Sequence, residues 1–202
     1  LTPAGEKLAA MAREQMRGLE GFLNSVENQA PSFAIGAGDS LIQWLLLPRL
    51  KLLERQFPGV RLNLLNRRAD DIIHDLRDLK LDFGLVRTDA LKTGLQSVPV
   101  FKMDFALFIP KSAFSSPLET IDPIRLMNEL PLAITEAGAF SRKVLDIATK
   151  NKGALHPVLQ CDSHPAVAAA VATGRYAAIL PLIAQTVLPA ATYHCVQAPK
   201  IF

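Results

Sequence analysis

The sequence predicts an α/β fold of two similar units, preceded by one long helix. Three observations lead to this prediction. Residues 2–29 carry helix signals without a break, residues 31–87 alternate short apolar strands with amphipathic helices, and residues 95–197 repeat that alternation. A length of 202 residues, of which 50% are hydrophobic and 20% charged, suits one large domain or two small ones.

The first helix begins with clear N-terminal signals. Thr2 can cap it and Pro3 fits its first position, so we expect a helix that extends to about Gln29. Its hydrophobic residues follow a heptad-like spacing, which typifies helices that pair. The seam that we expect to pair subunits consists of Leu8, Leu19, Phe22 and Val26. A helix of this kind needs a partner, either its own globular domain or a second helix from another chain.

The next segment predicts a parallel β-α-β-α-β unit. Its strands are "SFAIGAG", "PGVRLNLLN" and "LDFGLVR", and its helices are "DSLIQWLLLPRLKLLERQF" and "ADDIIHDLRDLK". Pro48 should kink the first helix because it lacks an N–H donor. We expect one face of that helix to carry Leu46, Leu50, Leu53 and Phe57. In the second helix the residues expected to point inward are Ile72, Ile73, Leu76 and Leu79.

The second unit is built in a similar way. Two strands in succession are predicted over 95–110, followed by strands at "PLAIT", "LHPVLQCD", "YAAILP" and "TYHCVQAP". Helices are predicted at "DPIRLMNEL", "AFSRKVLDIATKN", "HPAVAAAVATG" and "LIAQTVLPAA". Two α/β units with a cleft between them are a common way to hold a small ligand.

Composition and motifs exclude several functions. A net charge of +3 and a pI near 9.0 are too weakly basic to argue for nucleic acid. The most apolar region is interrupted at Gly174, Arg175 and Pro181, so it is not expected to span a membrane. There is no Cys/His metal spacing, P-loop, Gly-x-Ser-x-Gly or complete dinucleotide fingerprint. We therefore expect no enzymatic activity, no bound cofactor and no metal site. His74 and its neighbouring aspartates are expected on a solvated face.

Several motifs together resemble one protein family. "LTPAGEKL" resembles the start of the linker helix in LysR-type transcriptional regulators, and "IGAGDSLIQWLLLPRLKLLERQFPGVRLNLL" resembles the first strand-helix-strand of their effector-binding domain. "LKLDFGLV" and "HPAVAAAVATGRYAAILP" resemble two later motifs, although Tyr176 replaces a glycine of the last one. The resemblance covers essentially the whole chain, but without the winged helix-turn-helix and the final returning segment.

This resemblance implies a two-lobed, periplasmic-binding-protein-like (type 2) fold behind a linker helix. The implied divisions are residues 1–30 for the helix, 31–103 with 196–202 for subdomain I, and 104–195 for subdomain II. The implied function is sensing of a small, anionic metabolite in a cytoplasmic regulator that forms dimers or tetramers, binds no membrane, and contacts DNA only through the absent module. The alternative function is that of a solute-binding protein in a transport system. A third possibility is an enzyme built on the same two-lobed scaffold.

Candidate ligand-binding residues lie where strands become helices. In the first unit the resemblance favours Ser40 with its neighbours Asp39 and Leu41, and Arg87 could neutralise an acid. Helix N-termini supply N–H groups and partial positive charge, which suit a carboxylate, yet Asp39 or Ser40 could simply cap the helix. The second unit offers Thr135, Glu136 and Phe140, and a further helix start at Ser163 and His164. Thr135, Glu136 and Phe140 could also belong to an ordinary strand-to-helix loop, and Ser163 could simply cap its helix.

Overall fold

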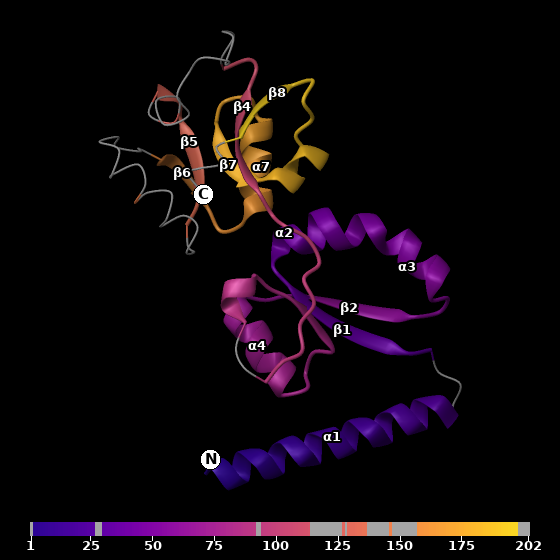
Figure 1. Cartoon of the computed structure of the whole chain (residues 1–202). Coiled ribbons are helices and arrows are strands. Elements are labelled where there is room, and N and C mark those ends of the chain that lie inside the picture. The colour runs from indigo at the N-terminus through magenta and orange to yellow at the C-terminus, as the bar shows by residue number, and fades with distance from the viewer. Residues whose placement is uncertain are drawn as a thin grey trace. The chain divides into compact units, whose positions relative to one another are not determined.

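The chain forms two compact units, Leu1–Val100 and Phe101–Phe202, which are described separately. The computed structural model describes residues 2–26, 30–91, 94–113, 127, 129–136, 146 and 157–197 (Figure 1). None of the helices in these ranges combines the length and apolar character that crossing a bilayer requires. No group of three or more His, Cys, Asp or Glu side chains in them could hold a metal ion.

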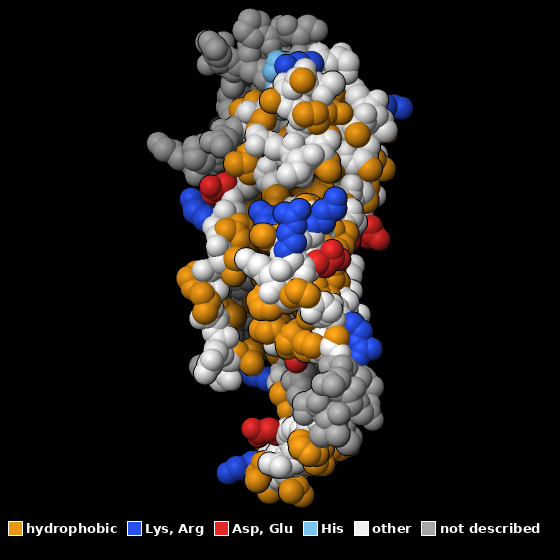
Figure 2. Space-filling model, turned by 90° about the vertical axis from the view of Figure 1, so that its right-hand side faces the viewer, with side chains coloured by type: hydrophobic (Ala, Val, Ile, Leu, Met, Phe, Trp, Pro, Cys, Tyr) orange, Lys and Arg blue, Asp and Glu red, His pale blue; other side chains and the backbone are white. Residues whose placement is uncertain are grey.

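The first helix, α1 (Pro3–Val26), begins as predicted. The Gly5 N–H donates to Thr2 Oγ1 over 3.2 Å, which confirms Thr2 as a cap. The hydrophobic seam lies open, because Leu8, Leu19 and Phe22 are 69%, 62% and 63% exposed. Hydrophobic side chains of α1 accordingly reach the surface at the bottom of Figure 2. The side chain of Val26 and the predicted helix end at Gln29 lie outside the described residues.

The first unit contains the predicted parallel sheet. Its strands β1 (Ser32–Ala37), β2 (Arg61–Asn66) and β3 (Phe83–Leu85) lie in the order β2-β1-β3, and both pairings are parallel. Helix α4 (Ala69–Arg77) buries Ile72 and Ile73, which confirms their predicted inward position. A Cβ at Gly36 or Gly84 would collide with side chains at or near α4. These two glycines therefore let the helix approach the sheet closely.

The helix after β1 is broken, as Pro48 predicts. It consists of α2 (Asp39–Leu41), a π-helix (Ile42–Leu46), a 3₁₀ turn (Leu47–Arg49) and α3 (Leu50–Gln56). The Arg49 side chain donates from Nη1 to the Leu45 carbonyl over 2.9 Å, so it satisfies an acceptor within the irregular segment. The prediction for Phe57 is wrong: it ends the helix with non-helical dihedral angles and is 58% exposed.

The second unit contains two groups of strands. Strand β4 (Phe105–Pro110) lies between β7 (Ala178–Pro181) and β8 (Tyr193–Gln197), antiparallel to both. Strands β5 (Leu132–Thr135) and β6 (Pro157–Cys161) are parallel, and a bridge from Leu132 to Ala177 links β5 to the residue before β7. Helix α7 (His164–Ala172) packs beside these strands. The core includes Leu107, Ile109, Met127, Leu132 and Ala177.

The segment before β4 differs from its prediction. Two successive strands are expected over 95–110, but residues 95–104 form neither helix nor strand. Val98 and Val100 are 82% and 68% exposed around Pro99, whose ring nitrogen cannot donate to a sheet. Apolar residues alone therefore do not make a strand here.

Other predictions for this unit have mixed outcomes. The segment predicted as a last helix contains a short 3₁₀ turn at Leu182–Thr186. Most of the two helices predicted over 122–130 and 139–151 lies outside the described residues. Val196 and Gln197 pair with β4 in the second unit. The assignment of residues 196–202 to subdomain I stays a prediction.

Candidate functional site

The carboxyl edge of the first sheet brings together the predicted residues of that unit. Strand β1 lies between β2 and β3, so the connections that follow β1 and β2 lead to opposite sides of it. Such a switch in strand order opens a crevice at the strand ends, where α/β sheets bind ligands. Asp39 and Ser40 follow β1, Arg87 follows β3, and Ala37 pairs with Leu85 at the two strand ends.

The helix start at this edge differs from the capping alternative. The N-cap residue is Gly38, in extended conformation and without a side-chain hydrogen bond. Neither Asp39 nor Ser40 occupies the cap position, so the capping interpretation is wrong. Asp39 Oδ1 instead accepts a 2.9 Å hydrogen bond from Gln43 Nε2, one turn further along the helix. Ser40 and Leu41 are partly buried.

Arg87 already has an anionic partner. Its Nε donates to Asp89 Oδ1 over 3.0 Å, and its Nη2 donates to Asp89 Oδ2 over 2.6 Å. Both side chains are largely exposed, at 63% and 64%. Neither Gln43 nor Asp89 is among the residues predicted from the sequence. A spacing of four residues on a helix brings the side chains of Asp39 and Gln43 together, whereas the pairing of Arg87 with Asp89 depends on the turn at Thr88–Ala90.

The second unit also gathers its predicted residues at strand ends. Thr135 ends β5, is 8% exposed, and pairs in register with Cys161 at the end of β6. The Glu136 N–H donates to the Cys161 carbonyl over 2.6 Å. Ser163 caps α7 by accepting from the Ala166 N–H over 3.3 Å, and His164 follows it. Four of the five candidates thus lie around one edge, and Phe140 lies outside the described residues.

His164 is held neutral by its surroundings. Burial lowers the pKa of His164 below its ordinary 6.5, because desolvation penalises the charged ring. Its ring lies 6.2 Å from that of Phe105, centroid to centroid. At neutral pH this edge therefore offers hydrogen-bonding groups without a histidine charge.

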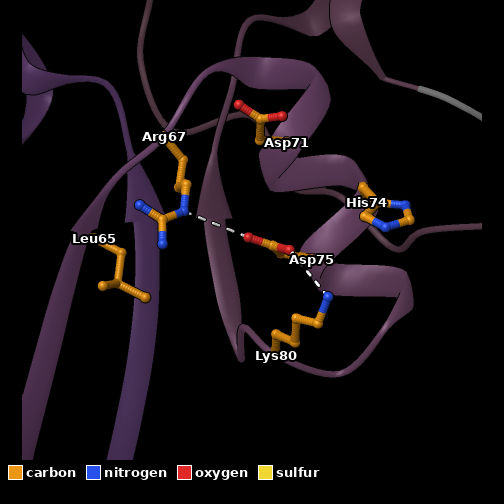
Figure 3. Close-up of a pocket in the computed structure, with 6 residues that line it drawn as sticks. All are labelled: Leu65, Arg67, Asp71, His74, Asp75 and Lys80. Carbon is orange, nitrogen blue, oxygen red and sulfur yellow. Dashed lines mark ion pairs between the residues drawn. The ribbon is translucent and has the colours of Figure 1, made fainter.

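A separate open hollow lies against α4 in the first unit (Figure 3). Leu65, Arg67, Asp71, His74, Asp75 and Lys80 line it. Asp75 lies 3.6 Å from Arg67 Nε and 3.8 Å from Lys80 Nζ, so its carboxylate is occupied by ion pairs. A hydrogen bond from Lys80 lowers the pKa of Asp78, against a weaker opposing effect of burial. His74 is 71% exposed, as the predicted solvated face requires, but Asp75 and Asp78 are only 18% and 23% exposed, so these two aspartates lie partly buried.

Comparisons with known proteins agree with this architecture. The family model for the LysR substrate binding domain matches residues 27–193. The chain is 25% identical over 114 residues to a Mycobacterium xenopi protein named "Probable hydrogen peroxide-inducible genes activator", and the match covers 54% of this chain and 60% of that protein. The chain therefore spans less than two thirds of the length of this relative.

Two solved structures show the same fold. A full-length OxyR variant from Pseudomonas aeruginosa superposes with a TM-score of 0.70 at 21% identity, covering 98% of this chain and 71% of that one. Full-length CbnR complexed with its target DNA gives 0.70 at 13% identity, covering 95% and 68%. Because the family match spans most of the sequence, the chain belongs to the LysR substrate-binding domain family and is an effector-sensing regulatory domain rather than a transport solute-binding protein.

Proposed function

We propose that this domain senses a small anionic metabolite and thereby modulates DNA binding by a winged helix-turn-helix elsewhere in the full protein. The observation that carries the proposal is the edge between β1 and β3. A switch in strand order, a helix start capped only by Gly38, and Arg87 occur there together. That combination places a switch point of the sheet, the backbone N–H groups of a helix start and the Arg87 guanidinium at one edge, and these groups suit a carboxylate.

Ser40 is the residue that we assign to direct ligand contact in this unit, beside Asp39 and Leu41. Its hydroxyl lies in the first turn and does not serve as the N-cap, so it can donate to an anion. Repulsion from Asp39 is reduced, because Gln43 engages that carboxylate one turn away. A hydrogen bond to a charged group contributes about 1.5–3 kcal/mol.

The second unit offers hydrogen-bonding groups of its own to an effector. Ser163 accepts from the backbone as a cap, which leaves its O–H proton able to donate to a ligand. Thr135 and neutral His164 add hydrogen-bonding atoms at the same edge, with Glu136 beside them. We propose that Phe140 packs on the apolar part of the ligand.

Assembly and partners follow from α1. Its exposed seam of Leu8, Leu19 and Phe22 favours pairing with the same helix of a second copy, in a dimer or tetramer. The CbnR structure contains target DNA, and we propose that this chain's full protein likewise binds DNA, in the cytoplasm and without a membrane partner. The domain would act as a sensor and not as an enzyme, and a ligand shifts such a switch only if it favours one arrangement.

Peroxide sensing, suggested by the name of the M. xenopi relative, fits this chain poorly. A sensor thiol reacts as its thiolate, so its pKa is normally lowered. The two cysteines of the sequence are Cys161 and Cys195. Burial raises the pKa of both thiols, with the nearby Asp162 adding to the effect at Cys161. Neither thiol therefore has the lowered pKa that a reactive sensor thiol normally shows.

The test is a screen of metabolites for stabilisation and for fluorescence change. Trp44 is the single tryptophan, is 4% exposed, and lies one turn after Ser40, so its emission should report on binding there. A ligand at 100 times its dissociation constant should stabilise the fold by about 2.7 kcal/mol. Stabilisation by cations or sugars alone, with no acid among the binders, would contradict the anionic site.

The first prediction is that Ser40→Ala weakens binding of the acid found in that screen by about 1.5–3 kcal/mol. The stability of the fold should change little, because Ser40 is not the cap. The matched variant Ser163→Ala removes a real cap and should cost about 1 kcal/mol of stability. Titration followed by Trp44 emission and urea unfolding measure both quantities. Unchanged affinity in Ser40→Ala would rule out the contact.

A further inference from the structure

The pair between Arg87 and Asp89 lies at the edge where the effector is expected. We propose that Asp89 is an internal competitor, a carboxylate that occupies the Arg87 guanidinium until an external acid displaces it. This inference rests on the proposed function of the Ser40 and Arg87 edge. It makes Asp89 a determinant of which acids bind, because a ligand must replace one carboxylate with another.

The geometry of the pair is that of a bound carboxylate. Two parallel hydrogen bonds join Nε and Nη2 of Arg87 to the two oxygens of Asp89, at 3.0 and 2.6 Å. This forked arrangement is the one in which arginine binds ligand carboxylates. The preferred face of the guanidinium is therefore taken, and an incoming acid must either displace Asp89 or accept a poorer face.

The competitor is also easy to displace. Both side chains are more than half exposed, and exposed ion pairs contribute little because water and salt screen them. The turn that carries Asp89 does not depend on the pair. Backbone bonds from the Ala90 N–H to the Arg87 carbonyl (3.0 Å) and from the Leu91 N–H to the Thr88 carbonyl (3.2 Å) hold it. Replacing Asp89 should therefore leave the turn folded and Arg87 available.

The test measures acetate binding to Arg87 directly. The Nε–Hε signal of Arg87 is followed by NMR while acetate replaces chloride at constant ionic strength. In Asp89→Asn, the dissociation constant for acetate should fall about three- to tenfold, because a weak ion pair and one nearby negative charge are removed. In the double variant Arg87→Gln with Asp89→Asn the gain should vanish. Glu54→Gln removes an equal charge from the exposed surface of α3 and should leave acetate affinity unchanged.

Two results would overturn the inference. One is that Asp89→Asn binds acetate with the same affinity as the wild type. Failure of acetate to bind either protein counts as this result. The other is an equal gain in Glu54→Gln, which would mean a general charge effect. The failure of the proposed function looks different: no metabolite acid binds the wild type, while Asp89→Asn still gains acetate affinity. If an acid binds through Ser40 but Asp89→Asn changes nothing, only the competitor role falls.

Discussion

Helices α1 and α4 belong to the same unit and have similar amphipathic patterns, but they use their apolar faces in opposite ways. Ile72 and Ile73 of α4 are 1% and 2% exposed, whereas Leu19 and Phe22 of α1 are 62% and 63% exposed. Gly36 and Gly84 of the sheet lack side chains, and this leaves room for side chains at or near α4. Periodicity thus identifies a helix and its apolar face, but not the surface that covers that face.

One described contact between α1 and the rest of its unit is an ion pair. Arg13 Nη2 lies 3.6 Å from Asp78 Oδ1, near the end of α4. Such a partly exposed ion pair contributes at most about 1 kcal/mol. The exposure of Leu8, Leu19 and Phe22 favours the second of the two alternatives for α1, a helix from another copy. Variants in both helices test this difference.

The largest effect is expected in α4. Ile72→Ala should lower the free energy of unfolding of the first unit by about 2–5 kcal/mol, because it removes buried methyl groups and leaves a cavity. Leu8→Ala removes a similar side chain from the exposed seam and should change the stability of the monomer by less than about 0.5 kcal/mol. Urea unfolding of both variants below the association concentration measures this. Equal losses would mean that α1 packs on its own unit.

A smaller effect on folding, but a large one on assembly, is expected from Leu19→Glu combined with Phe22→Glu. Burying two carboxylates against a partner helix costs several kcal/mol for each unpaired charge. An exposed single helix keeps them hydrated. Sedimentation should therefore show a smaller particle with a retained cooperative melt. Lys7→Glu changes the net charge equally, outside the seam, and should leave the particle size unchanged. An unchanged mass with a depressed melt in the double variant would refute pairing.

The smallest effect concerns the glycines of α1. Nothing lies within 4 Å of a Cβ built on Gly18 or Gly21. Alanine at either position should stabilise the helix by about 0.5–1 kcal/mol, because glycine loses more backbone entropy. The same change at Gly84 should destabilise the unit, since its Cβ would collide with Ile72. Circular dichroism during thermal melting shows whether each variant is stabilised or destabilised. A loss of helix signal in the α1 variants would contradict the prediction.

Much of the fold can be predicted because strands and helices leave local patterns. The apolar runs of β1, β2 and β3, the Pro48 break and the buried face of α4 all follow from nearby residues. Features that depend on distant contacts cannot be predicted in this way. Residues 95–104 have strand-like composition yet form no strand, and the strand order β2-β1-β3 depends on how the connections run in space.

The candidate site is predictable in position but not in its pairings. The sequence places Ser40 and Arg87 after two strands, and parallel pairing brings those strand ends together. It does not reveal that Gly38 takes the cap, that Gln43 engages Asp39, or that Asp89 occupies Arg87. These choices depend on the dihedral angles of single turns, which several residue types can satisfy.

The position of β4 in the second unit has a consequence during synthesis. All three strands of the first sheet are made by Leu85, so that sheet can close early. β4 is almost wholly buried, but its partners β7 and β8 end at Pro181 and Gln197. Until the ribosome has released those residues, the apolar stretch "FALFIP" has no partner on either side. Nascent chains should therefore depend on chaperones most strongly in the interval between the synthesis of β4 and that of β8.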